Sequence, residues 1–343
     1  MERKQRIILI VLAVVTIAIA IVALGLGAYY IPVDDILRLI ASRLGLLHDI
    51  GLDVTHDNVL FIIRMPRVLL GLLVGAALGV SGAAIQGIFR NPLAEPGLIG
   101  ISSGASLFAV MIIAMETLVF HSLAEWLGYY LLAFGAFFGA GLTAFVVYQI
   151  ARKEGKPNVT TMLLAGIAIN AFAGALTGLM TYMATEQQLR TITFWMLGSL
   201  GGATWDNVMA ILPFIAIPLI VLPFYGKALN AFALGELQAD LLGMRTERVK
   251  RWVILLSTLA VGASVAVSGI IGFVGLLVPH IIRLMGGSDH KFVLTGSMLL
   301  GAVVLTLADV LSRVLIAPIE LPIGVITALL GTPVFLYILI KDK

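Results

Sequence analysis

The chain has 343 residues, of which 60% are hydrophobic and only 12% are charged, and it contains no cysteine. A soluble domain carries about 25% charged residues, so this composition excludes an ordinary water-soluble protein and indicates a membrane protein. The missing cysteines exclude disulfides, thiolate catalysis and iron–sulfur ligation, and the net charge of +3 is small for this length. We therefore predict an all-α, polytopic fold with one membrane domain over residues 1–343.

Ten apolar segments are long enough to cross a bilayer, whose hydrocarbon core of about 30 Å takes about 20 helical residues. Each backbone amide in lipid must be paired within its own segment, so the segments are predicted to be helices. They cover residues 7–29, 60–88, 95–115, 127–150, 160–183, 205–225, 250–269, 271–285, 292–311 and 323–340. The eighth segment is the shortest, and it contains Pro279.

The first segment follows a basic start, Arg3, Lys4 and Arg6, which is also typical of a secretory signal peptide. Its apolar part is longer than the roughly 7–15 residues of a signal core, and no small-x-small cleavage site follows. We therefore interpret it as an uncleaved first helix.

The basic residues predict the orientation, because Lys and Arg are retained on the cytoplasmic side of a membrane protein. With the N-terminus inside, only a minority of the 22 basic residues fall on the outer side. The outer ones are Arg38, Arg43, Arg64, Arg67, Arg190 and Arg313. This bias indicates an even number of crossings with both termini in the cytoplasm.

An internal repeat relates the two halves of the chain. Residues 74–82 read VGAALGVSG and residues 261–269 read VGASVAVSG. The two copies lie in helices of opposite predicted direction, which is typical of transporters built from inverted repeats. A chance match between helices rich in glycine and alanine is the alternative.

Glycines spaced four residues apart predict seams where helix backbones approach closely, because lipid supplies no hydrophobic drive for packing. The spaced sets are Gly71/Gly75/Gly79, Gly135/Gly139 and Gly174/Gly178. A sharp turn is predicted at Asn91-Pro92, since proline cannot donate a hydrogen bond and forces the preceding residue out of a helix. The polar run that follows fits a plain loop or a broken segment that lines a cavity.

Three long motifs carry a family resemblance. They are RMPRVLLGLLVGAALGVSGAAIQGIFRNPLAEPGLIGISSGAS, GFVGLLVPHIIRL and ELPIGVITALLGTPVFLYIL. The chain closely resembles the FecCD-like permeases of the iron-siderophore, haem and cobalamin ABC importers from about residue 60 to the C-terminus. The resemblance implies a multi-pass protein of the inner membrane that forms a homodimer with a central pathway. It also implies two cytoplasmic ATPase subunits and an extracytoplasmic substrate-binding protein as partners, and no nucleic acid.

The resemblance also implies roles for particular residues. The longest inner connection, about residues 227–249, reads ALGELQADLLGM between Ala233 and Met244 and could form a short helix ended by Gly243. In the family this segment couples to the ATPase. The coupling residues are then Gly235, Glu236, Leu237, Asp240 and Gly243. The inner gate of the pathway is formed by Asn91, Pro92, Leu93, Thr160 and Thr161.

Three outer arginines, Arg64, Arg67 and Arg313, match positions that pair with acidic residues of the binding protein in this family. Taken alone, each is most simply interpreted as a snorkelling anchor at the membrane interface. Asp309 lies within the ninth segment, where an intramembrane acid suggests a functional site by default. An ion pair with Arg313, about one turn away, or a hydrogen bond at the helix end is the expected explanation, and coupling to a proton is the alternative.

Two other classes of protein, an ion-coupled secondary transporter and an intramembrane enzyme, are the alternatives to an ABC permease. No Lys is followed by Ser or Thr, so the chain has no phosphate-binding loop, and ATP with Mg²⁺ is expected in a partner subunit. The chain itself is expected to be no enzyme and to bind no cofactor or metal. A secondary transporter would show more buried ionisable groups, and an intramembrane enzyme would show a catalytic constellation. An iron-siderophore or haem is the expected cargo, with cobalamin as the alternative.

Overall fold

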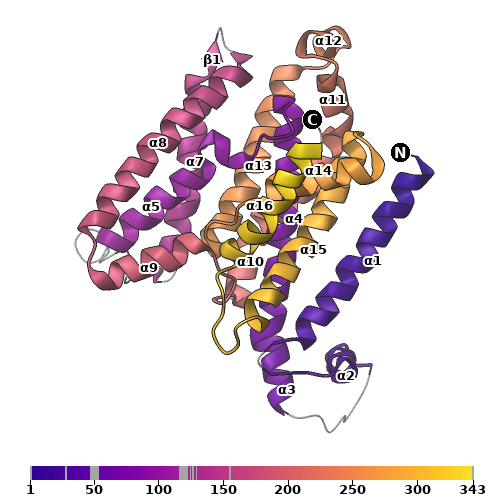
Figure 1. Ribbon diagram of the computed structural model, residues 1–343, viewed down its shortest axis with the longest axis vertical. Helices are drawn as coiled ribbons and strands as arrows, with labels where there is room; N and C mark the ends of the chain where they lie inside the picture. Colours follow the sequence, from indigo (N-terminus) through magenta and orange to yellow (C-terminus); the bar gives the residue numbers. More distant parts are fainter. Residues whose placement is uncertain are drawn as a thin grey trace.

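The computed structural model describes residues 2–27, 29–46, 54–115, 123, 125, 127–128, 130–153 and 156–341. Helices make up nearly all of this part of the chain (Figure 1). The main helices are α1 (Arg3–Gly25), α4 (Met65–Phe89), α5 (Ile101–Met115), α7 (Tyr130–Ile150), α8 (Val159–Met183), α10 (Trp205–Val221), α13 (Thr246–Ser268), α14 (Val274–Gly286), α15 (His290–Val314) and α16 (Ile323–Lys341).

Shorter elements connect the main helices. They are α2 (Val33–Arg43), α3 (Val54–Asn58), η1 (Val59–Arg64), η2 (Pro96–Ile99), α9 (Glu186–Leu197), η3 (Leu222–Tyr225), α11 (Gly226–Ala233), α12 (Glu236–Leu241) and the two-residue strands β1 (Arg152–Lys153) and β2 (Lys156–Pro157). The two strands form an antiparallel hairpin, which is the only sheet in the described ranges. The predicted all-α class is therefore confirmed.

The predicted membrane crossings correspond to helices of the structure. Seven helical stretches of the described chain are long and apolar enough to span a bilayer, and α5, α14 and α16 are shorter apolar helices. Pro279 lies inside α14 without ending it. Together these ten stretches coincide with the ten predicted segments.

Both termini lie at the same end of the molecule as α12 and β1, whereas α2 and α3 lie at the opposite end (Figure 1). An even number of crossings requires this arrangement. The end with the termini also carries most of the basic residues, so it is the cytoplasmic end.

Helix α4 forms the centre of the bundle. It is apolar on all sides, and nearly all its residues from Pro66 to Phe89 are buried, as expected for a helix surrounded by others. A methyl group at Gly79 would overlap the Ser297 carbonyl oxygen, and one at Gly75 would overlap that of Gly301. The predicted seam is confirmed here as the contact between α4 and α15.

The other two glycine pairs differ from each other. A methyl group at Gly139 would overlap the carbonyl oxygen of Gly104, so α5 and α7 are also in backbone contact. At Gly174 and Gly178 no heavy atom of the described residues lies within 4 Å of the added group. No helix of the described chain packs on this face of α8, so the seam predicted there stays a prediction.

The two copies of the repeat lie in α4 and α13, which are in contact and run in opposite directions (Figure 1). The first copy lies in the middle of α4, while the second ends α13 at Gly269, whose φ is +67°. This antiparallel placement is what an inverted repeat requires.

Candidate functional site

A broken segment follows α4. Arg90 ends the helix in the left-handed conformation at φ 49°, and the Leu93 amide donates to Asn91 Oδ1 at 2.9 Å. The predicted sharp turn at Asn91-Pro92 is thus present. The chain then forms η2 before α5 begins, so polar backbone groups of η2 lie among the spanning helices, where they need internal partners.

Side chains of α5 and α8 supply those partners. Asn170 of α8 donates to the Gly97 carbonyl oxygen at 3.1 Å and accepts a short hydrogen bond from Ser103 Oγ. Gly166 of α8 lies directly against the Leu98 carbonyl, where any side chain would overlap it. Asn170 therefore holds the broken segment against α8.

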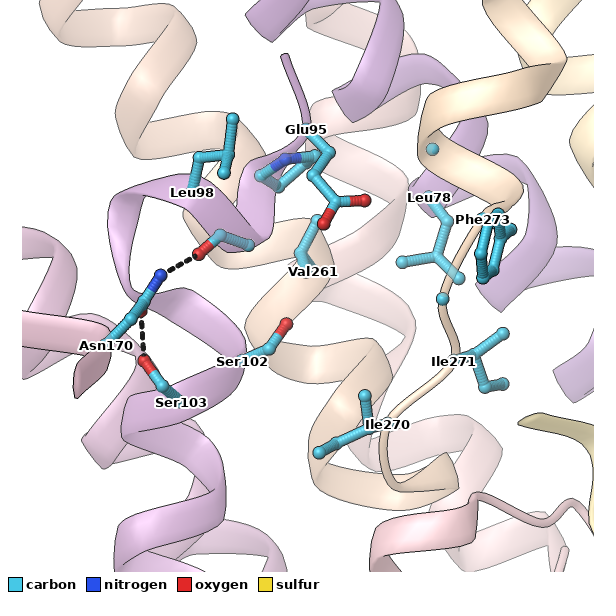
Figure 2. A pocket seen from close by; sticks show the side chains of 14 residues that line it. Leu78, Glu95, Leu98, Ser102, Ser103, Asn170, Val261, Ile270, Ile271 and Phe273 are labelled. Carbon is cyan, nitrogen blue, oxygen red and sulfur yellow. Dashed lines mark hydrogen bonds between the residues drawn. The ribbon is translucent and has the colours of Figure 1, made fainter. Parts of the chain in front are cut away.

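A cavity of about 260 Å³ lies beside these contacts (Figure 2). Most of its lining comes from η2, α5, α8 and the loop between α13 and α14. The Glu95 carboxylate and the Ser102 hydroxyl point into it, opposite the apolar side chains of Ile271 and Phe273 (Figure 2). The broken segment thus lines a cavity rather than forming a plain loop.

A second cavity of about 570 Å³ adjoins the first, since Ser102, Ser103 and Ile270 line both. Apart from Met196, its remaining lining is small or hydroxyl-bearing: Ser106, Gly174, Thr177, Gly178 and Thr181. Such a surface is smooth and offers few strong contacts, which suits a pathway from which a bound molecule must leave.

The predicted gate residues lie at the cytoplasmic ends of the same elements. Leu93 is 45% exposed, and Asn158 caps α8 by accepting from the Thr161 amide at 2.9 Å. Thr160 and Pro92 are exposed. Their role as a gate stays a prediction.

The predicted coupling segment forms the short helix α12. Gly235 precedes it at φ +126° and Gly243 follows it at φ +81°, so both ends need glycine. The Glu236 carboxylate forms a short ion pair with Lys250, and Thr246 donates to Asp240 Oδ1 at 2.6 Å. These two acids therefore bind α12 to α13.

Three exposed leucines lie on or directly after α12, beside the exposed polar residues Gln238 and Asp240. Leu237, Leu241 and Leu242 are 69%, 80% and 64% exposed, at the cytoplasmic end of the molecule. Exposed leucines on a short helix that is fixed at both ends are typical of a protein contact.

The outer arginines are not at a water-exposed rim, contrary to expectation. Arg64, Arg67 and Arg313 are only 4%, 6% and 7% exposed. Arg67 donates to Asp309 Oδ1 at 2.8 Å and to both carboxylate oxygens of Glu320, at 2.8 and 2.9 Å. This hydrogen bonding lowers the pKa of the Glu320 carboxyl below its usual range.

Arg313 and Arg64 also bind the C-terminal end of α1. Arg313 Nε lies 3.1 Å from Asp309 Oδ2, so the predicted ion pair is confirmed. The two arginines also donate to the last carbonyl oxygens of α1: Arg64 to Leu24 and Gly25 at 2.6 and 2.7 Å, Arg313 to Ala23 and Leu26 at 3.2 and 2.9 Å. They satisfy the carbonyl groups that a helix end leaves unpaired.

Some residues of this site were not identified from the sequence. Ser102, Ser103 and Asn170 line or support the cavity, and Glu320 completes the arginine network. Asn170 was detectable as a rare amide inside an apolar segment. No group of three or more His, Cys, Asp or Glu side chains among the described residues is placed to hold a metal ion.

The fold and the site define a class of protein. In the described part of the chain, ten apolar helices surround a broken segment beside a smooth cavity, and a short helix with exposed leucines lies at the cytoplasmic end. This arrangement belongs to a multi-pass transport permease of the inner membrane. The chain is a member of the FecCD transport family, whose model it matches over residues 12–341.

Relatives and a solved structure agree with this assignment. The chain is 45% identical to the hemin transport system permease protein HmuU of Yersinia pestis over 82% of this chain and 83% of the relative. It is 39% identical to the cobalamin import system permease protein BtuC of Halobacterium salinarum, over 85% and 76%. A structure described as an inward-facing conformation of a putative metal-chelate type ABC transporter superposes with a TM-score of 0.84 at 31% identity, covering 97% and 99% of the two chains.

Proposed function

We propose that this permease is the membrane subunit of an ABC importer for an iron chelate, either haem or an iron-siderophore, and that a separate ATPase powers it. The observation that carries the proposal is α12. It is fixed to α13 by Glu236 and Asp240 and presents three exposed leucines to the cytoplasm. A permease without a phosphate-binding loop needs a protein contact of this kind, through which ATP hydrolysis in the ATPase can drive transport.

The choice of cargo rests on the relatives. One is named for hemin transport and several for cobalamin or vitamin B12 import. Haem and cobalamin are both large tetrapyrrole-derived metal chelates, so a shared pathway of small and hydroxyl-bearing side chains suits either. Cobalamin is the alternative cargo.

The coupling role of α12 predicts an uncoupled variant. Leu237→Asp together with Leu241→Asp places two charges on the exposed face without touching Glu236 or Asp240. We expect the stimulation of ATP hydrolysis by substrate-loaded binding protein to fall at least tenfold, because the apolar contact to the ATPase is lost. ATP turnover of the reconstituted complex measures this.

Leu44→Asp is the matched control, since Leu44 is 70% exposed and follows α2 at the outer end. Full stimulation in the α12 variant, with the ATPase still bound, would place the coupling contact elsewhere.

A second copy of the chain is proposed to complete the pathway. The open face of α8 at Gly174 and Gly178 borders the second cavity, so a partner facing it would enclose the space. The gate would then lie at the Asn91-Pro92-Leu93 turn and at Thr160 and Thr161.

The gate is open to a labelling test, because the chain has no cysteine to give background. The variants Leu93→Cys and Thr161→Cys are labelled from the cytoplasmic side with a membrane-impermeant maleimide. We expect their labelling rates to differ several-fold between nucleotide-free and ATP-bound complexes. Equal rates in both states would remove these residues from the gate.

Docking of a substrate-binding protein at Arg64, Arg67 and Arg313 is proposed to proceed through exchange of carboxylates. Glu320 is the most exposed member of the network, with 45% of its side chain accessible, and it occupies the Arg67 guanidinium. An acidic residue of the binding protein could take its place. Reversing the arginines would damage the fold, so the test changes Glu320 instead.

Glu320→Gln should speed association with the binding protein roughly two- to fivefold at low salt, because one competing charge is removed. The gain should vanish at high salt, because the distance over which exposed charges interact then falls below about 8 Å. Asp34→Asn, an exposed acid on α2, should change the rate less. Identical rates for Glu320→Gln and the parent at every salt concentration would mean that docking does not use this network.

A further inference from the structure

An apolar groove of about 820 Å³ lies between α7 and α13, apart from the two pathway cavities. Aromatic side chains dominate its lining, with Phe134, Phe138 and Phe145 more than half exposed. Gly141 lies in the middle of the groove, and no heavy atom lies within 4 Å of a methyl group added there. The groove is therefore an open channel along the outside of the bundle, as far as the described chain covers it.

The cytoplasmic end of the groove is polar. Arg251 is the one charged residue among those lining it, and no described residue forms a hydrogen bond or ion pair with it. The Tyr148 hydroxyl is buried at the same end and has no hydrogen-bond partner within the described residues. Leaving a buried hydroxyl without a hydrogen bond costs free energy. The Tyr148 hydroxyl and the Arg251 guanidinium are both donors, so a ligand with an acceptor group would suit this end of the groove.

The dimensions of the groove match one leaflet of a bilayer. Arg251 and Leu259 are eight residues apart on α13, which is about 12 Å at 1.5 Å per residue. Half of a hydrocarbon core of about 30 Å is about 15 Å. Arg251 thus lies near the cytoplasmic headgroups when the phenylalanines lie at acyl-chain depth.

We propose that this groove binds an anionic phospholipid of the cytoplasmic leaflet, independently of what the permease transports. One acyl chain lies along the phenylalanines past Gly141. The phosphate accepts hydrogen bonds from the Arg251 guanidinium and the Tyr148 hydroxyl. Basic pockets between helices on the cytoplasmic side are suited to anionic headgroups, and arginine pairs with phosphate through its planar fork.

The test is native mass spectrometry of the whole purified protein, titrated in detergent with palmitoyl-oleoyl phosphatidylglycerol or with phosphatidylcholine of the same chains. The parent should retain phosphatidylglycerol in preference. Gly141→Leu fills the groove and should weaken binding of both lipids at least tenfold. Arg251→Gln should weaken phosphatidylglycerol about fivefold, which corresponds to about 1 kcal/mol, and should weaken phosphatidylcholine less, because choline already offsets the charge of its phosphate. Tyr148→Phe should weaken it about two- to threefold.

Two controls separate the site from general effects. Ala18→Leu enlarges an exposed side chain of α1, a helix that does not line the groove, and Lys227→Gln removes an exposed charge of α11 at the cytoplasmic end. Both should bind lipid as the parent does.

The proposal is wrong if the parent does not prefer phosphatidylglycerol, or if Gly141→Leu binds both lipids unchanged. A changed oligomeric mass of Gly141→Leu with unchanged lipid binding would make the groove a contact between copies of the chain. Should Gly141→Leu fail to fold, the Arg251→Gln and Tyr148→Phe variants decide: no loss of phosphatidylglycerol binding in either overturns the site.

Discussion

Gly79→Leu is expected to yield no stably folded protein in detergent, whereas Gly178→Leu, on the face proposed to meet a second copy, is expected to leave the fold of each single chain intact. At Gly79 even a methyl group would overlap the Ser297 carbonyl oxygen of α15, so a leucine forces the two central helices apart. Overpacking a dense core costs about 1–3 kcal/mol and sometimes more. The rigid partner here is backbone, so the cost should be at the upper end. Size-exclusion profiles and melting temperatures measure it.

Gly178 is the matched control because it lies within a helix of equal length and faces open space. Replacing it removes a helix-weakening glycine without any overlap. A folded Gly79→Leu protein with an unchanged melting temperature would mean that α4 and α15 are not in backbone contact.

Asp309→Ala is expected to lower the melting temperature strongly, as the second large effect. The Asp309 side chain lies between Arg67 and Arg313 at 2.8 and 3.1 Å and is only 2% exposed. Removing one partner of a buried ion pair costs about 3–5 kcal/mol, since the remaining charge stays buried without compensation. Arg313 loses its ion pair with Asp309, whereas Arg67 keeps its ion pair with Glu320.

Asp206→Ala provides the comparison, because Asp206 is an exposed acid in the first turn of α10 and should contribute well under 1 kcal/mol. Equal melting temperatures for the two variants would show that the arginine network does not stabilise the fold. A stable Asp309→Ala protein that transports normally would also leave the acid without a role.

The membrane crossings were predictable because each depends on a local apolar run of sufficient length. The same applies to the turn at Asn91-Pro92, which proline and its neighbour determine within a few residues. Helix α9 was missed although its start carries a signal: Thr185 and Gln188 form a capping box. A search for membrane crossings does not find it, because its sequence is too polar to cross a bilayer.

The burial of Arg64, Arg67 and Arg313 was not predictable from local sequence. Arg67 finds its partners 242 and 253 residues away, and only the packing of α4 against α15 brings them together. Arg64 and Arg313 bind backbone carbonyl oxygens at the end of α1. Every residue has such an oxygen, so no sequence motif identifies these partners. Similarly, the open face at Gly174 shows that small-residue spacing identifies a surface for close approach without identifying its partner.

The most direct test of the account is uptake of haemin into proteoliposomes that contain this permease, its ATPase and its binding protein, with ferric siderophore and cyanocobalamin assayed in parallel. The account predicts haemin or siderophore accumulation that requires ATP and the ATPase and that proton or sodium gradients cannot replace. Accumulation driven by an ion gradient without the ATPase, or no ATP-dependent accumulation of any of the three chelates, would contradict it.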